Sequence, residues 1–149
     1  MTMAGAGEYF ARDPSLVASG EGRYFDLGTD VHPVEFVPGL EFRPVIGERM
    51  LVNFVHYAPH TEAPSHAHEE EQMTFVVDGE FEFDLDGDVR MMHPGMAVYV
   101  PAGVPHGAKT RESTCYEIDV FSPPRRVLVE AAQAMEAGEE IVAEPPEAS

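Results

Sequence analysis

The sequence predicts an all-β protein built as a sandwich or barrel, and three features support this. Thirteen prolines and thirteen glycines divide the 149-residue chain into short pieces. Few of these pieces show the 3.6-residue spacing of a helix, and several alternate between apolar and polar residues. Between residues 34 and 121 the pattern predicts about eight to ten short strands joined by turns, which is typical of sandwiches and barrels.

Individual strands can be assigned within this region. The segment MLVNFVHY, Met50 to Tyr57, is rich in β-branched and aromatic residues and nearly all apolar, which predicts a strand covered on both faces. The segment FEFDL, Phe81 to Leu85, alternates strictly between apolar and acidic residues. Asp78-Gly79 and Asp86-Gly87 flank it and predict hairpin turns. Further strands are predicted at VRMM, AVYV and TCYEIDVF, the last over residues 114–121.

The two ends of the chain differ from this middle. Residues 1–33 form an N-terminal extension with little predicted structure, apart from a short helical turn near Pro14 to Ala18. The barrel is expected over residues 34–122. A helix is predicted from Val127 to Met135 and ends at Gly138, so that residues 123–149 form a C-terminal helix and an acidic tail. A chain of 149 residues is long enough for one such domain to fold alone.

Composition restricts the classes of function. The formal net charge is −18, from 27 acidic against 9 basic residues, which disfavours nucleic acid and anionic membranes as partners. No run of about 18 apolar residues is present to span a bilayer, and the first residues do not resemble a secretory signal. The single cysteine, Cys115, excludes an internal disulfide framework and is expected to be a small buried hydrophobe. We therefore expect a cytoplasmic protein that acts on a small molecule.

Two stretches of the sequence carry candidate metal ligands. In PSHAHEEEQ, His66 and His68 are two residues apart, so both point to the same face of an extended strand, and Gln72 has the same parity. Downstream, the proline-rich loop VPAGVPH presents His106 at the start of a strand. Imidazole is the commonest ligand for divalent first-row metals, and Zn²⁺, Mn²⁺, Fe²⁺ and Ni²⁺ all accept this set. Three imidazoles and one oxygen leave coordination positions free for a substrate, as a catalytic metal requires.

Two further residues remain open as members of the site. Glu70 also has inward parity, although the simpler expectation is that the run Glu69 to Glu71 consists of solvated loop carboxylates. His56 lies on the strand before the metal loop and can face the cavity, although an exposed or satisfied strand histidine is the simpler expectation. An apolar wall around a few polar groups is typical of small-molecule sites, and we expect that wall to include Met50, Phe54, Met73, Phe75 and Phe83.

The segment IDVFSPPR, residues 118–125, contributes a second group of polar residues. Asp119 and Phe121 share one face of the predicted strand, and Pro123-Pro124 ends it and determines where Arg125 projects. Taken alone, these residues support two interpretations equally. Arg125 can grip a substrate carboxylate in bidentate fashion while Asp119 moves a proton, or the two can form an ion pair that stabilises the barrel mouth.

The two histidine stretches resemble the conserved motifs of the cupin superfamily. The first motif reads G-x5-H-x-H-x3-E-x6-G, and here His60 stands at the first glycine and Gln72 at the glutamate. The second reads G-x5-P-x-G-x2-H-x3-N, and here Thr110 stands at the asparagine. The resemblance covers roughly residues 34–122 and implies a cupin double-stranded β-helix, or jelly-roll barrel, with a metal ion inside. A glutamine ligand is neutral, which favours stabilising an enolate or alkoxide over one-electron chemistry.

Within the superfamily, three segments together resemble the KdgF-type cupins, which convert 4,5-unsaturated uronates into linear keto forms. These segments are H-x-H-x-x-E-Q, G-E-F-E-F and D-x-F-S-P-P-R. The resemblance implies metal ligation by His66, His68, Gln72 and His106. It implies a catalytic and substrate-holding group made of Asp119, Phe121 and Arg125.

The function expected from this resemblance is metal-dependent, non-redox proton transfer on a small oxygenated metabolite, as a ketonisation, isomerisation or lyase step. Three alternatives remain open. They are a metal-dependent cupin dioxygenase, an enzyme similar to the manganese-dependent hydroxynitrile lyases, and a non-catalytic small-molecule-binding cupin. Barrels of this type commonly pair their sheets, so a homodimer is expected.

Overall fold

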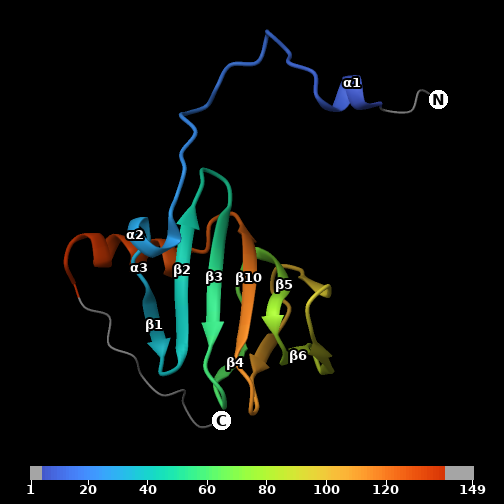
Figure 1. Cartoon of the computed structure of the whole chain (residues 1–149), viewed down its shortest axis with the longest axis vertical. Helices are drawn as coiled ribbons and strands as arrows, with labels where there is room; N and C mark the ends of the chain where they lie inside the picture. The colour runs from blue at the N-terminus through green and yellow to red at the C-terminus, as the bar shows by residue number, and fades with distance from the viewer. Residues whose placement is uncertain (1–4, 140–149) are drawn as a thin grey trace.

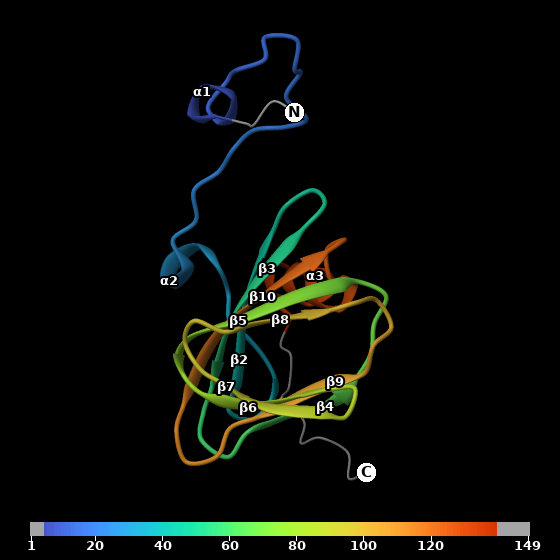
Figure 2. The same ribbon diagram turned by 90° about the vertical axis from the view of Figure 1, so that its right-hand side faces the viewer.

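The computed structural model describes residues 5–139, in which two antiparallel sheets form a barrel (Figure 1). The larger sheet has six strands in the order β1-β2-β3-β10-β5-β8: Val34–Val37, Leu40–Ile46, Leu51–Tyr57, Cys115–Ser122, Glu71–Gly79 and Ala97–Val100. The smaller has four strands in the order β4-β9-β6-β7: Glu62–His66, His106–Lys109, Phe81–Leu85 and Asp88–Met92. Figure 2 shows the two sheets facing each other across the barrel interior. The predicted all-β jelly-roll fold is confirmed.

The register of the central strands brings distant polar residues together. Strand β10 lies between β3 and β5 and pairs antiparallel with both. Asp119 is opposite Asn53 on one side and Thr74 on the other. Because side chains of directly opposed residues point to the same face of a sheet, these three lie side by side on the inner face of the barrel.

The two Asp-Gly pairs have different roles in the fold. Asp86 and Gly87 have φ angles of 49° and 91° and close a two-residue hairpin between β6 and β7, as the primed turns require. Gly79 also has a positive φ, 76°, but β5 pairs with β10 and β8 rather than with β6. The predicted hairpin at Asp78-Gly79 is therefore wrong. The left-handed conformation of Gly79 instead lets the chain pass from β5 in the larger sheet to β6 in the smaller sheet.

Strand β3 is buried on one face only, which corrects the prediction of a strand covered on both. Its outward residues, Val52 and Phe54, are half-buried, and His56 is exposed. The outer face is only partly covered, since Arg43, opposite the outward Phe54, donates hydrogen bonds to the carbonyls of Leu27 and Val31. The buried inward residues are Leu51, Asn53, Val55 and Tyr57.

The main hydrophobic core fills the interior between the two sheets. Cys115 belongs to it with 1% of its surface exposed, and burial raises the pKa of its thiol to about 12. This confirms the expectation of a small buried hydrophobe. The ten buried members of this core are Leu40, Val55, Tyr57, Val76, Phe81, Phe83, Met92, Val100, Ala108 and Cys115.

The C-terminal helix α3, Arg126–Glu136, lies within two residues of its predicted limits. Gly138 follows it with a φ of 80°, the left-handed conformation that ends many helices. Leu128 packs with Leu51 and Phe121 in a second hydrophobic cluster. The helix is thereby held against one end of the barrel, next to Phe121.

The N-terminal residues contain two short helices, α1 at Ala6–Tyr9 and α2 at Leu27–Asp30. The helical turn predicted at Pro14 to Ala18 is wrong, because the Asp13 carboxylate accepts hydrogen bonds from the Ser15 backbone N–H and hydroxyl at 2.9 and 2.6 Å and forms an isolated turn instead. Residues 5–26 extend away from the barrel (Figure 1).

Two predictions about the ends of the chain remain predictions. The predicted acidic tail after Glu139 lies outside the described residues. The division into domains at residues 33 and 122 stays a prediction. None of the helices between residues 5 and 139 is both long and apolar enough to cross a membrane.

Candidate metal centre

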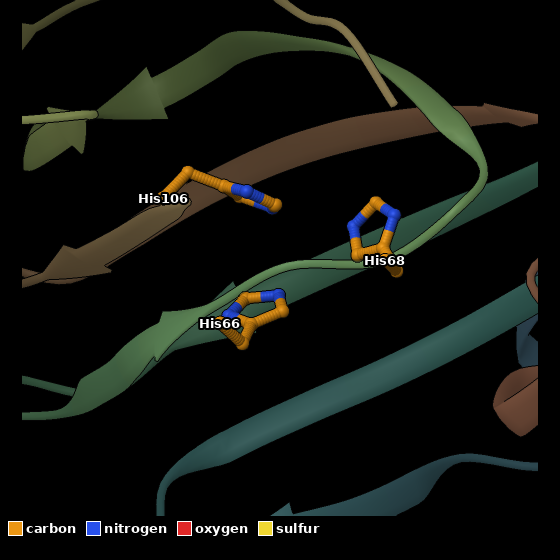
Figure 3. A group of neighbouring side chains, drawn as sticks. All are labelled: His66, His68 and His106. Carbon is orange, nitrogen blue, oxygen red and sulfur yellow. The ribbon is translucent and has the colours of Figure 1, made fainter. Parts of the chain in front are cut away.

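Three histidines from two distant segments converge, with His106 buried, His68 half-buried and His66 exposed (Figure 3). His66 ends β4, His68 lies just beyond it, and His106 begins β9, directly opposite His66 in the sheet. One ring nitrogen of each lies within 4.8 Å of those of the other two. The ring centroids are 4.4 Å apart for His66 and His106, 4.9 Å for His68 and His106, and 5.6 Å for His66 and His68. This spacing is compatible with one shared ion.

Backbone carbonyls determine the tautomer of all three rings. Each Nδ1 lies 2.8 to 2.9 Å from a carbonyl oxygen, and the acceptors belong to Pro64, Glu70 and Val104. Because a carbonyl can only accept, Nδ1 carries the hydrogen and Nε2 keeps a free lone pair. Hydrogen bonds of this kind orient metal-binding imidazoles in proteins.

Two of the rings, those of His66 and His106, have lowered pKa values that favour the neutral form needed for metal binding. Burial lowers the pKa of His106 to about 4, although the hydrogen bond to Val104 acts in the opposite direction. The pKa of His66 is also lowered, mainly by loss of solvation. At neutral pH these imidazoles therefore need not lose a proton before they bind a cation.

Gln72, the fourth predicted ligand, places its side-chain oxygen beside two of the histidines. Its Oε1 lies 3.1 Å from Nε2 of His68 and 3.1 Å from Nε2 of His106. Its amide N–H donates to Thr74 Oγ1 at 2.7 Å and to Asp119 Oδ1 at 3.3 Å, which keeps the oxygen turned towards the histidines. The Nε2 atoms of His68 and His106 therefore face the amide oxygen lone pair to lone pair. Such an arrangement suits a divalent cation between them, so these residues fit a metal ion.

Asp119 lies beside the proposed ligands on the inner face of β10. Thr74 Oγ1 donates to its Oδ1 at 2.5 Å, and Gln72 donates to the same oxygen. Burial raises the pKa of Asp119, while hydrogen bonds from Glu117, Thr74 and Gln72 and the nearby His66 lower it. A cation at the histidines would also lower the pKa of Asp119.

Phe121 shares the inner face with Asp119, as predicted. Its ring meets the His68 ring edge to face, at 5.6 Å and 71°. Only 5% of its surface is exposed. Phe121 is therefore well placed to hold His68 in its orientation.

Glu70 is buried, which corrects the expectation of a solvated carboxylate. It is 3% exposed, and its Oε1 lies 3.7 Å from His68 Nδ1 and 3.5 Å from Arg125 Nη1. The backbone N–H of Arg126 donates to Oε2 at 3.0 Å. Burial opposes ionisation, but this hydrogen bond and the charge of Arg125 bring the pKa of Glu70 below its usual value. Its neighbours Glu69 and Glu71 are exposed.

The contacts of Glu70 answer two questions that the sequence left open. Glu70 touches the Nδ1 side of His68, away from the nitrogen that faces the other histidines, so it supports the ligand instead of joining the set. Arg125 forms its ion pair with Glu70, so the alternative of an Asp119–Arg125 ion pair at the mouth is wrong. The Arg125 side chain is 21% exposed, and Arg125 lines the cavity.

A cavity of about 150 Å³ joins these groups. It brings together six of the seven predicted site residues, namely His66, Gln72, His106, Asp119, Phe121 and Arg125. The seventh, His68, lies at the edge through its contacts with Gln72 and Phe121. Their roles as metal ligands and catalytic groups stay predictions.

The cavity wall differs from the predicted one. Of the five predicted wall residues only Phe83 contributes. Phe54, Met73 and Phe75 have the outward parity of β3 and β5, and Met50 is 46% exposed. The wall also contains residues that were not predicted from the sequence, among them Phe36, Phe42, Asn53, Tyr57 and Glu117. For Glu117 a signal was available, because it is two residues from Asp119 on the same strand and must share its face.

His56 and the two residues that depart from the cupin motifs, His60 and Thr110, have no contact with the three histidines among the hydrogen bonds and ring contacts of residues 5–139. His56 is on the outer face, stacked on Tyr116 with ring centroids 4.2 Å apart. His60 has a φ of 53°, the left-handed conformation of the glycine that it replaces in the motif. Thr110 is buried, donates to Ala58 O at 2.6 Å and accepts from Thr61 N at 3.0 Å, which is a structural role.

Comparison with known proteins agrees with this geometry. The family model described as "Cupin domain" matches residues 53–121. No curated protein matches the sequence. Among solved structures, an RmlC-like cupin from Shewanella frigidimarina is 27% identical, with a TM-score of 0.65 over 72% of this chain and 96% of that one. KdgF from Halomonas sp. is 29% identical, with a TM-score of 0.61 over 65% of this chain and 92% of that one.

A third structure resembles the chain in fold alone. The polyketide cyclase RemF from Streptomyces resistomycificus is 24% identical, with a TM-score of 0.60 over 68% of this chain and 80% of that one. The matched domain over residues 53–121 and the similarity to the RmlC-like cupin and to KdgF confirm the predicted resemblance to the cupin superfamily.

Proposed function

We propose that the protein is a metal-dependent enzyme that transfers a proton, without redox chemistry, on a small oxygenated metabolite, with 4,5-unsaturated uronates as its substrate class. The observation that carries this proposal is the orientation of the Gln72 amide. Its oxygen faces the histidines and its nitrogen donates to Asp119. One side chain thus connects the place for a cation to a carboxylate that can serve as a general acid or base.

The remaining residues of the cavity have complementary roles in this proposal. A divalent ion held by the three histidines and Gln72 would polarise a substrate oxygen. Asp119 takes a proton from the substrate or returns it at the neighbouring carbon. Arg125 binds the substrate carboxylate in bidentate fashion, and its pairing with Glu70 holds the guanidinium at the cavity. Phe121 and helix α3 exclude water from one side.

The similarity to KdgF supports the choice of substrate class. That protein is 29% identical to this chain, and the segment D-x-F-S-P-P-R, residues 119–125, supplies three of the residues that line the cavity here. The neutral glutamine in the ligand set supports the non-redox reaction, because the cation keeps its full charge for a substrate oxygen.

Turnover of 4,5-unsaturated galacturonate by the metal-loaded protein tests the proposal. Loss of the ultraviolet absorbance of the conjugated double bond measures the rate. We expect Asp119→Asn and Arg125→Ala to lower kcat/KM by about 10²-fold or more, with metal content unchanged by elemental analysis. Glu69→Gln, at an exposed neighbouring position, is the matched control and should keep full activity. Full activity in both site variants would contradict the proposed roles.

Two measurements distinguish the other reaction classes. A dioxygenase also suits three imidazoles and an oxygen ligand, and it predicts oxygen uptake by the Fe²⁺-loaded protein at an oxygen electrode. A non-catalytic binding cupin predicts much less than one metal ion per chain after purification without chelator. The expected homodimer is checked by the mass in solution from light scattering.

A further inference from the structure

Asn53 and Glu117 are polar residues that lie deeper in the barrel than the metal centre. Phe121 is opposite Gln72, Asp119 is opposite Asn53, and Glu117 is opposite Val55 and Val76. Each step of two residues along β10 moves further from Arg125 and the mouth. Both Asn53 and Glu117 line the same cavity as the histidines.

Each of these side chains has a buried oxygen without a partner. Asn53 is 1% exposed and Glu117 is 2% exposed. Asn53 Oδ1 and Glu117 Oε2 receive no hydrogen bond from any residue between 5 and 139. Buried polar atoms in native proteins are almost always paired, so an unpaired one that borders a cavity suggests a missing ligand.

The chemistry of the two groups limits what that ligand can be. An amide oxygen can only accept a hydrogen bond. Burial raises the pKa of Glu117 well above its usual value, and the neighbouring charge of Asp119 and the hydrogen bond to it act in the same direction. Burial thus favours the protonated form of Glu117, in which its carboxyl hydrogen can be donated to Asp119. The subsite thus needs a neutral group that donates hydrogen bonds, and a hydroxyl is such a group.

We propose that Asn53 and Glu117 form a subsite that binds hydroxyl groups of a polyhydroxylated substrate. This inference rests on the proposed function, in which Arg125 binds the substrate carboxylate and the histidine end holds the reacting oxygen. A carboxylic acid without hydroxyls leaves both deep oxygens unpaired, so it binds more weakly than a sugar acid of the same size.

Paired ligands and paired variants test the subsite. Titration calorimetry on the metal-loaded protein compares glucuronate with tetrahydropyran-2-carboxylate, which keeps the ring and the carboxylate but lacks the hydroxyls. We expect wild type to bind glucuronate about tenfold more tightly, because two hydrogen bonds are added. Asn53→Leu and Glu117→Leu should lose most of this preference. Glu117→Gln keeps a donor for Asp119 and a carbonyl oxygen for the ligand, and it should retain the preference.

Thermal unfolding without ligand provides a second measurement that does not depend on activity. Replacing a buried polar group that has no partner by an apolar one of similar size can be nearly neutral, so Asn53→Leu should melt close to the wild-type temperature. Glu117→Leu also removes the hydrogen bond to Asp119, so the melting temperature at this position is compared for Glu117→Gln, which keeps that bond. A clear fall in the melting temperature of Asn53→Leu or Glu117→Gln would indicate a structural role and would overturn the proposal. An unchanged ligand preference would overturn it too, as would equal weakening of both ligands.

The outcome separates this inference from the proposed function. Hydroxyl preference without turnover of any unsaturated uronate would eliminate the proposed reaction and leave the subsite standing. Turnover by a wild-type protein that shows no hydroxyl preference would eliminate the subsite and leave the reaction.

Discussion

The two ends of the barrel interior are built on the same strands but differ in polarity. On β10, Asp119 and Glu117 face inward near the metal centre, and Cys115 faces inward at the other end. On β5, Thr74 belongs to the polar end and Val76 to the apolar end. Two residues along a strand are enough to pass from a hydrogen-bonded network to a hydrophobic core.

This comparison separates the residues that stabilise the fold from those that serve a site. The apolar end buries its side chains against one another and contributes the hydrophobic free energy of folding. The polar end buries groups that are costly without partners, and it contains the two unpaired oxygens of Asn53 and Glu117. Changes at the polar end should therefore affect binding more than stability, and changes at the apolar end the reverse.

The largest expected effect is the loss of metal in His106→Ala. The ring nitrogen of His106 is one of three that converge, and His106 is buried at the centre. We expect metal content, measured by elemental analysis, to fall to below about a tenth of an ion per chain. The unfolding free energy of the metal-free protein should fall by only about 1 kcal/mol, for the lost hydrogen bond to Val104. His56→Ala, on the outer face, is the control and should keep its metal.

The converse change is Leu40→Ala at the apolar end. Leu40 is 2% exposed, belongs to the main core and does not border the metal cavity. We expect a loss of about 2–5 kcal/mol in the free energy of unfolding, measured with urea. The folded variant should bind as much metal as wild type. Loss of metal by a variant that is still folded would show that the two ends are not independent.

The smallest expected effect concerns Glu70, which supports a ligand from outside the set. Its carboxylate lies 3.7 Å from His68 Nδ1, and groups behind a ligand typically change metal affinity by about 10–100-fold. For Glu70→Gln we expect a loss of about tenfold, because the backbone carbonyl of the same residue still holds the ring. Competition with a chelator measures the affinity. Glu69→Gln should show no change, and equal losses in both would remove the specific role of Glu70.

The sequence was sufficient for features that depend on local periodicity. The spacing of His66 and His68 implied a shared face, and Asp119 and Phe121 were assigned a common face for the same reason. The limits of helix α3 followed from Pro124 before it and Gly138 after it. Such features depend on neighbours within a few positions, which the sequence shows directly.

The errors share one cause, which is that strand pairing and layer coverage are not local. Asp78-Gly79 was predicted to close a hairpin, but β5 pairs with β10 and β8 instead of β6. The wall residues Phe54, Met73 and Phe75 were chosen for their apolar character, but their parity directs them to the outer face. Apolar character does not indicate which face of a sheet a layer will cover.

Alternation and turn residues act over a few positions, so the sequence alone was sufficient for the all-β class, the two histidine segments and the faces that their side chains share. The ion pair of Arg125 with Glu70, which is 55 residues away along the chain, became apparent only in the folded chain. The same holds for the burial of Glu117 in the cavity, which raises the pKa of its carboxyl group. Burial and the partners of a charge depend on which distant strands become neighbours, and no short segment contains that information.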